Sequence, residues 1–362
     1  MEESAMQFGI SYPTYIRAWH DVQMAEDYGF SHAWFDDSHM CYSDIFATMA
    51  LAAEHSRISV LGTFVLCAGN RATPVSATAL ATLNELAPGR VIAGIGTGFS
   101  ARNVMGMPAT PLKVLAEEVG VLRELLAGRE ALYCEGERKR AVRLLHAEMG
   151  FINVKDPVPI YVGANLPKAI RVVGEVGDGW ITVGADPAMI RNGLVEIRSA
   201  AKAAGRTLAH IPTVIVTAGC VLRDGEDIML PRVFGRLGSW GALTLHTIWH
   251  PENTPIGPFA PPEFQSLAKR YFDEYIMNMK TPWEKRYQEI HLGHLIFTKP
   301  GEERYITRRL LEATTITGPS SAVIERIKEL EEAGVTCLAL RLTGTDGREM
   351  IREFGNEVIA RY

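Results

Sequence analysis

Two carboxylates and an imidazole lie within four residues of one another, directly after the short apolar run 32–35. They are Asp36, Asp37 and His39. Histidine has the side-chain pKa closest to neutral, so it can take or give a proton, and a nearby Asp can fix its tautomer. The pattern favours acid–base chemistry, with His39 and Asp37 as the catalytic residues. The structural alternative is that an Asp caps the next helix and His39 is an ordinary surface residue.

Two glycine-containing loops, 94–101 and 162–169, each follow a predicted strand. In the first, exposed backbone N–H groups and the hydroxyls of Thr97 and Ser100 could cradle a phosphate. The second opens a helix with Lys168 in its first turn, which makes a second candidate anion site. Each loop alone could be a tight turn between strand and helix. Together, on neighbouring strands, they favour a shared phosphoryl ligand.

Two pairs of histidines stand far from these loops, His246 with His250 and His291 with His294. Helical spacing could bring each pair to one face, as a metal site requires. There is no H-E-x-x-H motif and no dense set of carboxylates beside them. We therefore predict no metal, and expect these histidines to be polar core or substrate-loop residues.

The elements that must position these groups alternate along the chain as strands and helices, which is typical of a parallel sheet with crossover helices. Eight strands are predicted, at residues 6–11, 32–35, 58–65, 91–95, 159–162, 180–183, 212–221 and 337–342. Helical patterns lie between them, at residues 17–28, 45–55, 75–86, 112–126, 168–176, 187–204 and 322–333.

This count favours a single α/β domain over the whole chain, a (β/α)8 TIM barrel, with a long insertion at about 223–319 before the last strand. An open doubly wound sheet would use fewer strands and carry G-x-G-x-x-G after the first. A second interruption, at 131–157, is rich in charge. Because barrel active sites gather on the loops at one rim, we expect the insertion to cover the barrel mouth.

Composition narrows the functions further. The chain has 362 residues and a formal net charge of −5, so no basic field attracts nucleic acid or an anionic membrane. Its apolar runs are shorter than the roughly 18–20 residues that a membrane span needs. The first six residues do not resemble a secretory signal. Five scattered cysteines without C-x-x-C spacing favour a reducing cytoplasm, so we expect a cytoplasmic protein.

Six short motifs, taken in order, resemble the bacterial luciferase-like superfamily of flavin- and F420-dependent oxidoreductases, and most closely its methylenetetrahydromethanopterin reductase-like branch. The likeness covers residues 6–204 and returns at 316–342. Its elements are AEDYGF at 25–30, DSHM at 37–40, LGTFV at 61–65, ATLNEL at 81–86 followed by Gly89 and Arg90, GIGTG at 94–98, and PIYVGA at 159–164.

The resemblance implies a barrel whose mouth holds F420 or FMN, in a protein that is often a homodimer. Its cofactor-binding positions fall here on two phosphate-facing loops and on the end of the third strand. A non-proline cis peptide is expected there, at Phe64–Val65. The predicted cofactor-binding residues are Thr63, Phe64, Val65, Gly96, Gly98, Ser100, Ala101, Gly163, Ala164 and Lys168. Two mouth segments depart from the branch, since relatives often have Gln at the position of His39 and Asn-Pro-x-x-Arg-His-Pro where 67–74 stands.

The leading interpretation is an F420-dependent oxidoreductase that transfers a hydride between the deazaflavin and a small organic substrate, while His39 and Asp37 manage the proton. The first alternative is a two-component FMN monooxygenase, which would take reduced flavin from a flavin reductase partner and use oxygen. The same fold can host both. The second alternative is a flavin-binding protein without turnover, or a metal-dependent hydrolase on the same barrel.

Overall fold

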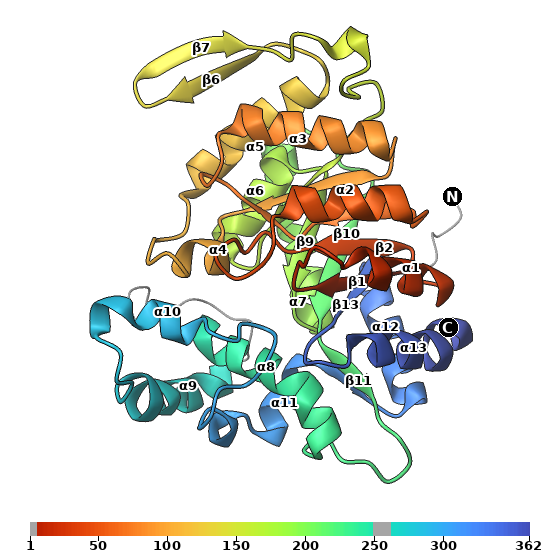
Figure 1. Ribbon diagram of the computed structural model, residues 1–362, viewed down its shortest axis with the longest axis vertical. Coiled ribbons are helices and arrows are strands. Elements are labelled where there is room, and N and C mark those ends of the chain that lie inside the picture. The colour runs from red at the N-terminus through yellow and green to blue at the C-terminus, as the bar shows by residue number, and fades with distance from the viewer. Residues whose placement is uncertain (1–5, 249–261) are drawn as a thin grey trace.

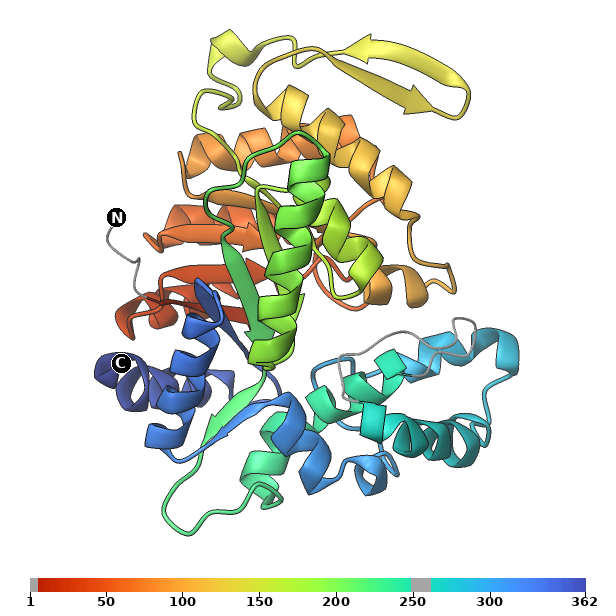
Figure 2. The same cartoon turned by 180° about the vertical axis from the view of Figure 1, so that it is seen from behind.

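Eight parallel strands close into a barrel in the computed structural model, which describes residues 6–248 and 262–362 (Figures 1 and 2). The sheet order is β3-β2-β1-β13-β10-β9-β8-β5, and β5 pairs again with β3 to close the ring. The strands are β1 (Gln7–Tyr12), β2 (His32–Phe35), β3 (Val60–Thr63), β5 (Val91–Gly96), β8 (Ile160–Gly163), β9 (Gly179–Val183), β10 (Thr213–Thr217) and β13 (Cys337–Arg341). The predicted (β/α)8 barrel is confirmed.

Residues along each barrel strand alternate between the barrel interior and the helix-covered outside, because successive side chains of a strand point to opposite faces. Ile92 packs inside, whereas Val91 and Ala93 pack outside. The buried interior cluster consists of Trp34, Ile92, Tyr161, Ile181, Val214, Val216, Cys337 and Ala339. Both faces are buried, which explains why these strands read as continuous apolar runs in the sequence.

Helices follow the strands and cover the outside of the barrel (Figure 1). Several begin at recognisable caps: the carboxylate of Asp44 accepts hydrogen bonds from Phe46 N and Ala47 N, each 3.0 Å long. Pro167 and Pro187 stand in first turns, where no N–H is needed. The helices are α1 (Trp19–Asp27), α2 (Ile45–His55), α3 (Thr73–Leu86), α4 (Phe99–Asn103), α5 (Leu112–Leu126), α6 (Pro167–Val176), α7 (Pro187–Ala203), α12 (Ser320–Glu332) and α13 (Gly347–Glu357).

The third predicted strand, 58–65, is interrupted near its end. β3 stops at Thr63, the peptide bond Phe64–Val65 is cis as expected, and the two-residue β4 (Leu66–Cys67) follows. The neighbouring β5 approaches closely here: a Cβ on Gly94 would stand 2.0 Å from the carbonyl oxygen of Thr63. Glycine is therefore required where β5 passes this bend.

The seventh predicted strand, 212–221, is divided into β10 and β11 (Gly219–Val221). β11 leaves the barrel and pairs in parallel with β12 (Ile316–Gly318). The two ends of the predicted insertion 223–319 are thus held side by side. Its helices are α8 (Pro231–Ile248), α9 (Gln265–Tyr271), α10 (Arg286–Ile290) and α11 (Arg308–Thr314), joined by short 3-10 and π-helical turns at Pro262–Phe264, Phe272–Ile276, Trp283–Lys285 and Glu303–Tyr305.

The insertion builds apolar cores of its own, and Figure 1 shows α8 to α11 gathered on one side of the barrel. One core joins Leu245 of α8 with residues of α9 and the segment after it. The other joins further residues of α8 with α11, β11 and Leu295. Among the described residues, no helix combines the length and apolarity required to cross a membrane.

The charged interruption 131–157 contains an antiparallel hairpin, β6 (Ala131–Glu135) and β7 (Arg138–Val142). It follows α5 and precedes β8, so it leaves the barrel on the side where strands begin. Figure 1 shows it far from α8 and α11. The hairpin is therefore remote from the rim at which the candidate loops meet.

Candidate functional site

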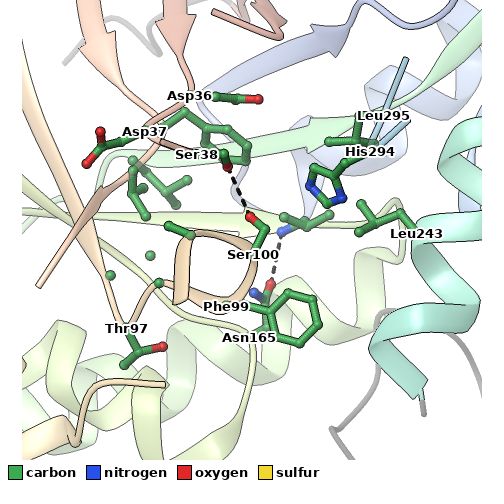
Figure 3. A pocket seen from close by; sticks show the side chains of 18 of the residues that line it. Asp36, Asp37, Ser38, Thr97, Phe99, Ser100, Asn165, Leu243, His294 and Leu295 are labelled. Atoms are coloured by element: carbon green, nitrogen blue, oxygen red, sulfur yellow. Dashed lines mark hydrogen bonds between the residues drawn. The ribbon is translucent and has the colours of Figure 1, made fainter. Parts of the chain in front are cut away.

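A pocket opens at the carboxyl ends of the barrel strands and holds about 920 Å³ of unoccupied space, counted out to its mouth (Figure 3). The volume within it that is open to the centre of a water molecule is about 170 Å³. One wall comes from the rim, at the ends of β2, β3, β5, β8, β9 and β13. The other comes from the insertion, through Trp240 and Leu243 of α8 and through His294 and Leu295. The insertion therefore supplies one wall of the pocket at the predicted rim of the barrel.

Asp36 forms a buried ion pair across the top of the barrel. Both of its carboxylate oxygens accept hydrogen bonds from Arg341, each 2.7 Å long, and Arg341 also donates to Ser11 Oγ at 3.0 Å. β1 lies between β2 and β13, so Arg341 reaches over Ser11 to its partner. Burial raises the pKa of Asp36, and Arg341 opposes that rise. The pair supplies the pocket with a polar end of low net charge.

Asp37 and His39 have different partners from Asp36. Asp37 lines the pocket, and its Oδ2 accepts hydrogen bonds from Arg71 at 2.5 Å and from Cys67 N at 3.3 Å. Its Oδ1 is buried and has no hydrogen-bond partner within the described part of the chain. His39 stands beside the pocket, with Nε2 3.3 Å from Asn70 Nδ2. The structure thus gives Asp37 an available acceptor atom and keeps His39 in the loop behind it.

The predicted glycine loop after β5 lines the pocket almost completely. Ser100 Oγ lies 3.1 Å from Ser38 Oγ, which ties this loop to the end of β2. Gly98 has φ +74, and a Cβ there would stand 1.9 Å from Cys67 Sγ. Its backbone conformation and its proximity to Cys67 therefore both require glycine. The predicted residues that line the pocket are Asp37, Phe64, Val65, Gly96, Gly98, Ser100, Ala101 and Gly163.

Three of the predicted cofactor-binding residues lie outside the pocket lining. Thr63 is buried and donates its hydroxyl to Gly94 O at 2.7 Å. Ala164 is buried in the barrel wall, where its carbonyl accepts the indole N–H of Trp180 at 2.8 Å. Lys168 is exposed on α6. The polar group that the second loop does bring to the pocket is Asn165, whose amide oxygen accepts from Thr182 Oγ1 and Val183 N.

His294 faces the rim from the insertion, and Figure 3 shows its ring reaching into the pocket. Burial lowers its pKa to about 3, helped by His246 and Arg341, so the ring is neutral near pH 7. Its carbonyl accepts a 2.5 Å hydrogen bond from Tyr42, which fixes the segment to the β2–α2 loop. Leu295 has φ +58, a strained conformation for a branched residue.

A buried polar cluster lies behind His294. His246 Nε2 is 2.9 Å from Tyr271 Oη and 3.3 Å from Glu302 Oε1. Lys299 Nζ lies 2.8 Å from the same carboxylate. Although burial raises the pKa of Glu302, its partners His246 and Lys299 bring it down to about 2. Within the described ranges no group of three or more His, Cys, Asp or Glu side chains has a metal-binding arrangement; His250 lies outside those ranges.

The residues missing from the sequence-based assignment come mainly from distant parts of the chain. Asp36 and Asn165 stand inside motifs that had been identified, and their strand-end positions were a usable signal. Arg341 also ends a predicted strand. The insertion residues carried no such signal, because nothing in their local sequence indicates which barrel loop they meet. These further lining residues are Asp36, Ser38, Thr97, Phe99, Asn165, Ile181, Val183, Trp240, Leu243, His294, Leu295 and Arg341.

Comparisons with known proteins agree with this geometry. Residues 6–337 match the family model of luciferase-like monooxygenases. The chain is 26% identical to a 5,10-methylenetetrahydromethanopterin reductase from Archaeoglobus fulgidus, over 98% of this chain and 99% of that protein. It is 32% identical to an F420-dependent glucose-6-phosphate dehydrogenase from Nakamurella multipartita, over 70% and 76% of the two chains.

Among solved structures, the F420-dependent tetrahydromethanopterin reductase from Methanopyrus kandleri superposes with a TM-score of 0.70. The two chains share 21% identity, and the alignment covers 99% of each. At this level of identity the match describes the fold alone.

Proposed function

Because the chain belongs to the luciferase-like monooxygenase family, we propose that it is an F420-dependent oxidoreductase, which transfers a hydride between the deazaflavin and a small organic substrate. The observation that carries the proposal is the pocket itself. It joins apolar walls to a glycine loop rich in backbone N–H groups, as a flat ring with a phosphate tail requires. The F420 dependence in the names of two related proteins supports the same choice of cofactor.

The pocket residues fit such a cofactor. Phe64 and Val65 face Ile181 and Val183 as apolar walls for a ring system. The loop 96–101 offers hydroxyl and backbone donors for a phosphate, and Gly98 could not carry a side chain there. When bound, the deazaflavin would supply the hydride chemistry. The protein residues would hold it, orient the substrate and exclude water.

Proton transfer at the rim remains part of the proposal. The buried Oδ1 of Asp37 is the atom to which we assign the acid–base role. Its other oxygen, Oδ2, is already paired with Arg71. His39 would act through Asp37 and the loop that holds Asn70. The role of the pair is therefore to accept and orient a proton on a substrate or cofactor N–H or O–H group.

The substrate end of the pocket favours an uncharged, largely apolar molecule. Trp240, Leu243 and Leu295 form it, and the cation in that region, Arg341, is neutralised by Asp36. A phosphate group binds best where cationic side chains are available for charge-assisted hydrogen bonds. We therefore expect glucose 6-phosphate to be a poor substrate, although one of the related proteins is named for it.

The test is a titration of the purified apo-protein with F420 and FMN, oxidised and reduced, followed by fluorescence. Tighter binding of F420 than of FMN, together with F420-linked turnover of an uncharged alcohol or imine from a substrate panel, would support the proposal. Preference for reduced FMN would favour the alternative, a two-component monooxygenase with a flavin reductase partner. F420 binding without turnover would favour a non-catalytic flavin-binding protein, and binding of neither cofactor would refute the assignment.

We further propose that the protein is a cytoplasmic homodimer. The hairpin and the segment after it expose large apolar side chains, including Leu132, Leu145, Met149 and Phe151, each more than 60% exposed. Such surfaces are typical of protein–protein contacts. Light scattering after gel filtration would give twice the 39.9 kDa chain mass if this is so, and a monomer mass would reject it.

A further inference from the structure

A small second cavity lies directly behind His294, on the insertion side of the pocket. It shares Leu243, His294 and Leu295 with the pocket and is otherwise lined by residues of α8 and the segment 292–302. The volume open to the centre of a water molecule is about 10 Å³. Ser239, His246 and Glu302 also line it. The cavity therefore connects the pocket with the buried cluster described above.

Three polar atoms at this cavity are buried without a hydrogen-bond partner in the described part of the chain: Ser239 Oγ, His246 Nδ1 and His294 Nδ1. A buried polar atom left unpaired costs about 1–3 kcal/mol. A water molecule is stable in a buried site that offers room and two to four polar partners. The cavity's volume is about the minimum that one water needs, and the residues that carry the three unpaired atoms all line it.

We propose that His294 is the acid–base group on the insertion side of the pocket, and that a single buried water links its Nδ1 to His246, which Glu302 backs. The proposal rests on the function proposed above, because it assigns a role in proton transfer that accompanies hydride transfer. It adds a second proton-handling group to the rim pair Asp37 and His39. Its residues all come from the insertion.

Hydrogen bonding fixes the tautomer of His246. The carboxylate of Glu302 accepts hydrogen bonds and cannot donate them, so Nε2 of His246 carries the proton. Tyr271 Oη, 2.9 Å away, donates to the same carboxylate at 2.7 Å and so presents its lone pairs to His246. Nδ1 of His246 is then a bare acceptor facing the cavity. Burial lowers the pKa of His246, and the carboxylate of Glu302 opposes that fall by stabilising the imidazolium that forms when Nδ1 takes a proton.

His294 presents its other ring nitrogen to the pocket. Its Nδ1 is buried without a partner among the described residues, so we assign Nε2 to the ring edge that lines the pocket. The strained φ of +58 at Leu295 and the hydrogen bond from Tyr42 hold the ring there. The other titratable or charged groups that face the two imidazoles are Arg341 and Tyr42 on the pocket side, His291 edge-on to both rings, and Lys299, Glu302 and Tyr271 behind.

These groups can take up and pass on the proton that the substrate loses. If a bound deazaflavin supplied the hydride chemistry, the substrate O–H or N–H next to the oxidised carbon would have to lose one proton. That proton bonds to His294 Nε2 while the Nδ1–H bond breaks toward the water, and the water passes a proton to His246 Nδ1. The products are a neutral His294, an intact water and an imidazolium opposite Glu302. Reduction runs through the same steps in reverse.

The experiment uses the full chain labelled with ¹⁵N at histidine, with and without bound F420. Long-range ¹H–¹⁵N spectra from pH 5.5 to 8 report which nitrogen of each ring carries the proton. We expect His246 to be protonated at Nε2. We also expect H246Q and S239A each to exchange the protonated and bare nitrogens of His294, because each removes one partner of the water. The exposed H210Q variant serves as the matched control and should leave His294 unchanged.

A crystal structure of the same protein provides the second measurement, which keeps the test valid if H246Q does not fold. Water density within hydrogen-bond reach of Ser239 Oγ and both Nδ1 atoms would support the proposal. An empty cavity would overturn it. So would ring ¹⁵N signals of His294 that are the same in wild type, S239A and H246Q. Failure of F420 to bind would reject the proposed function alone, since the apo-protein spectra report the linkage independently.

Discussion

The two walls of the pocket hold their polar groups in opposite ways. At the rim, the carboxyl groups of Asp36 and Asp37 are paired with Arg341 and Arg71 at 2.5–2.7 Å. On the insertion wall, His294 is a neutral ring with an unpaired buried nitrogen. Paired charges resist displacement because breaking one pair leaves the other charge buried. Apart from Oδ1 of Asp37, which has no partner among the described residues, the rim carboxylates are therefore held in ion pairs, whereas the insertion wall presents a neutral ring.

The largest expected effect follows from breaking the rim pair. D36N leaves the Arg341 guanidinium buried without a carboxylate, and we expect a loss of about 3–5 kcal/mol in the free energy of unfolding. Urea denaturation measures it. The control is E196Q, which removes a more exposed partner of Arg171 and should cost no more than about 1 kcal/mol. Equal losses in the two variants would contradict the distinction between buried and exposed pairs.

The next effect tests the insertion wall. H294Q removes the neutral imidazole from the pocket, so we expect hydride transfer to slow by about 10²-fold, at the low end for a lost acid–base group. F420 affinity should be unchanged, because the glycine loop lies on the other wall. Stopped-flow absorbance of the cofactor separates the two quantities. An unchanged rate, with H210Q as the reference, would remove His294 from the mechanism.

How much of the fold and of the pocket can be predicted from the sequence depends on how far apart the contacting residues lie along the chain. The barrel strands were predictable, since burial on both faces leaves continuous apolar runs such as 91–95. The glycine loop was predictable because strand ends of a parallel barrel meet at one rim. The bend at Phe64–Val65 was expected only from the family resemblance.

The rest depended on long-range contacts that local patterns do not encode. His294 lines the same pocket as Ser38 and Ser100, although both serines lie far from it along the chain, and no local pattern fixes that approach. Lys168 had the right local setting, a first helical turn after a strand, yet α6 is oriented so that its side chain faces solvent. Asn165 reaches the pocket instead. Lys168 and Asn165 both follow the end of β8, and they differ in the direction in which their side chains point.

A third, smaller effect concerns the glycine loop that joins the walls. G98A places a side chain at φ +74 and 1.9 Å from Cys67 Sγ, so the loop must shift. We expect F420 affinity to fall about tenfold, equivalent to ~1.4 kcal/mol. G205A is a matched control, since Gly205 has φ +71 but nothing within 4 Å of the added Cβ. Calorimetric titration should show a loss for G98A alone. An equal loss in both variants would indicate general backbone strain.

The smallest effect is a difference in pH dependence between the walls. The pKa of His294 is about 3 in the folded chain and about 6.5 when unfolded, so the unfolded state binds more protons between these values. Stability from this group is present above pH 6.5 and is lost as pH falls towards 3. The loss reaches about 1.4 kcal/mol at pH 5.5. Burial raises the pKa of Asp36, so this group changes stability with pH in the opposite direction. Its contribution cancels when wild type and H294Q are compared, because both proteins contain Asp36.

We therefore expect H294Q to lose less stability than wild type between pH 8 and pH 5.5, by about 1.4 kcal/mol. Urea denaturation at the two pH values measures the difference, and H210Q should behave as wild type because His210 is exposed. Parallel pH profiles for wild type and H294Q would mean that His294 has the same pKa in the folded and the unfolded chain. That result would contradict the burial-lowered pKa of His294 and with it the contrast between the two walls.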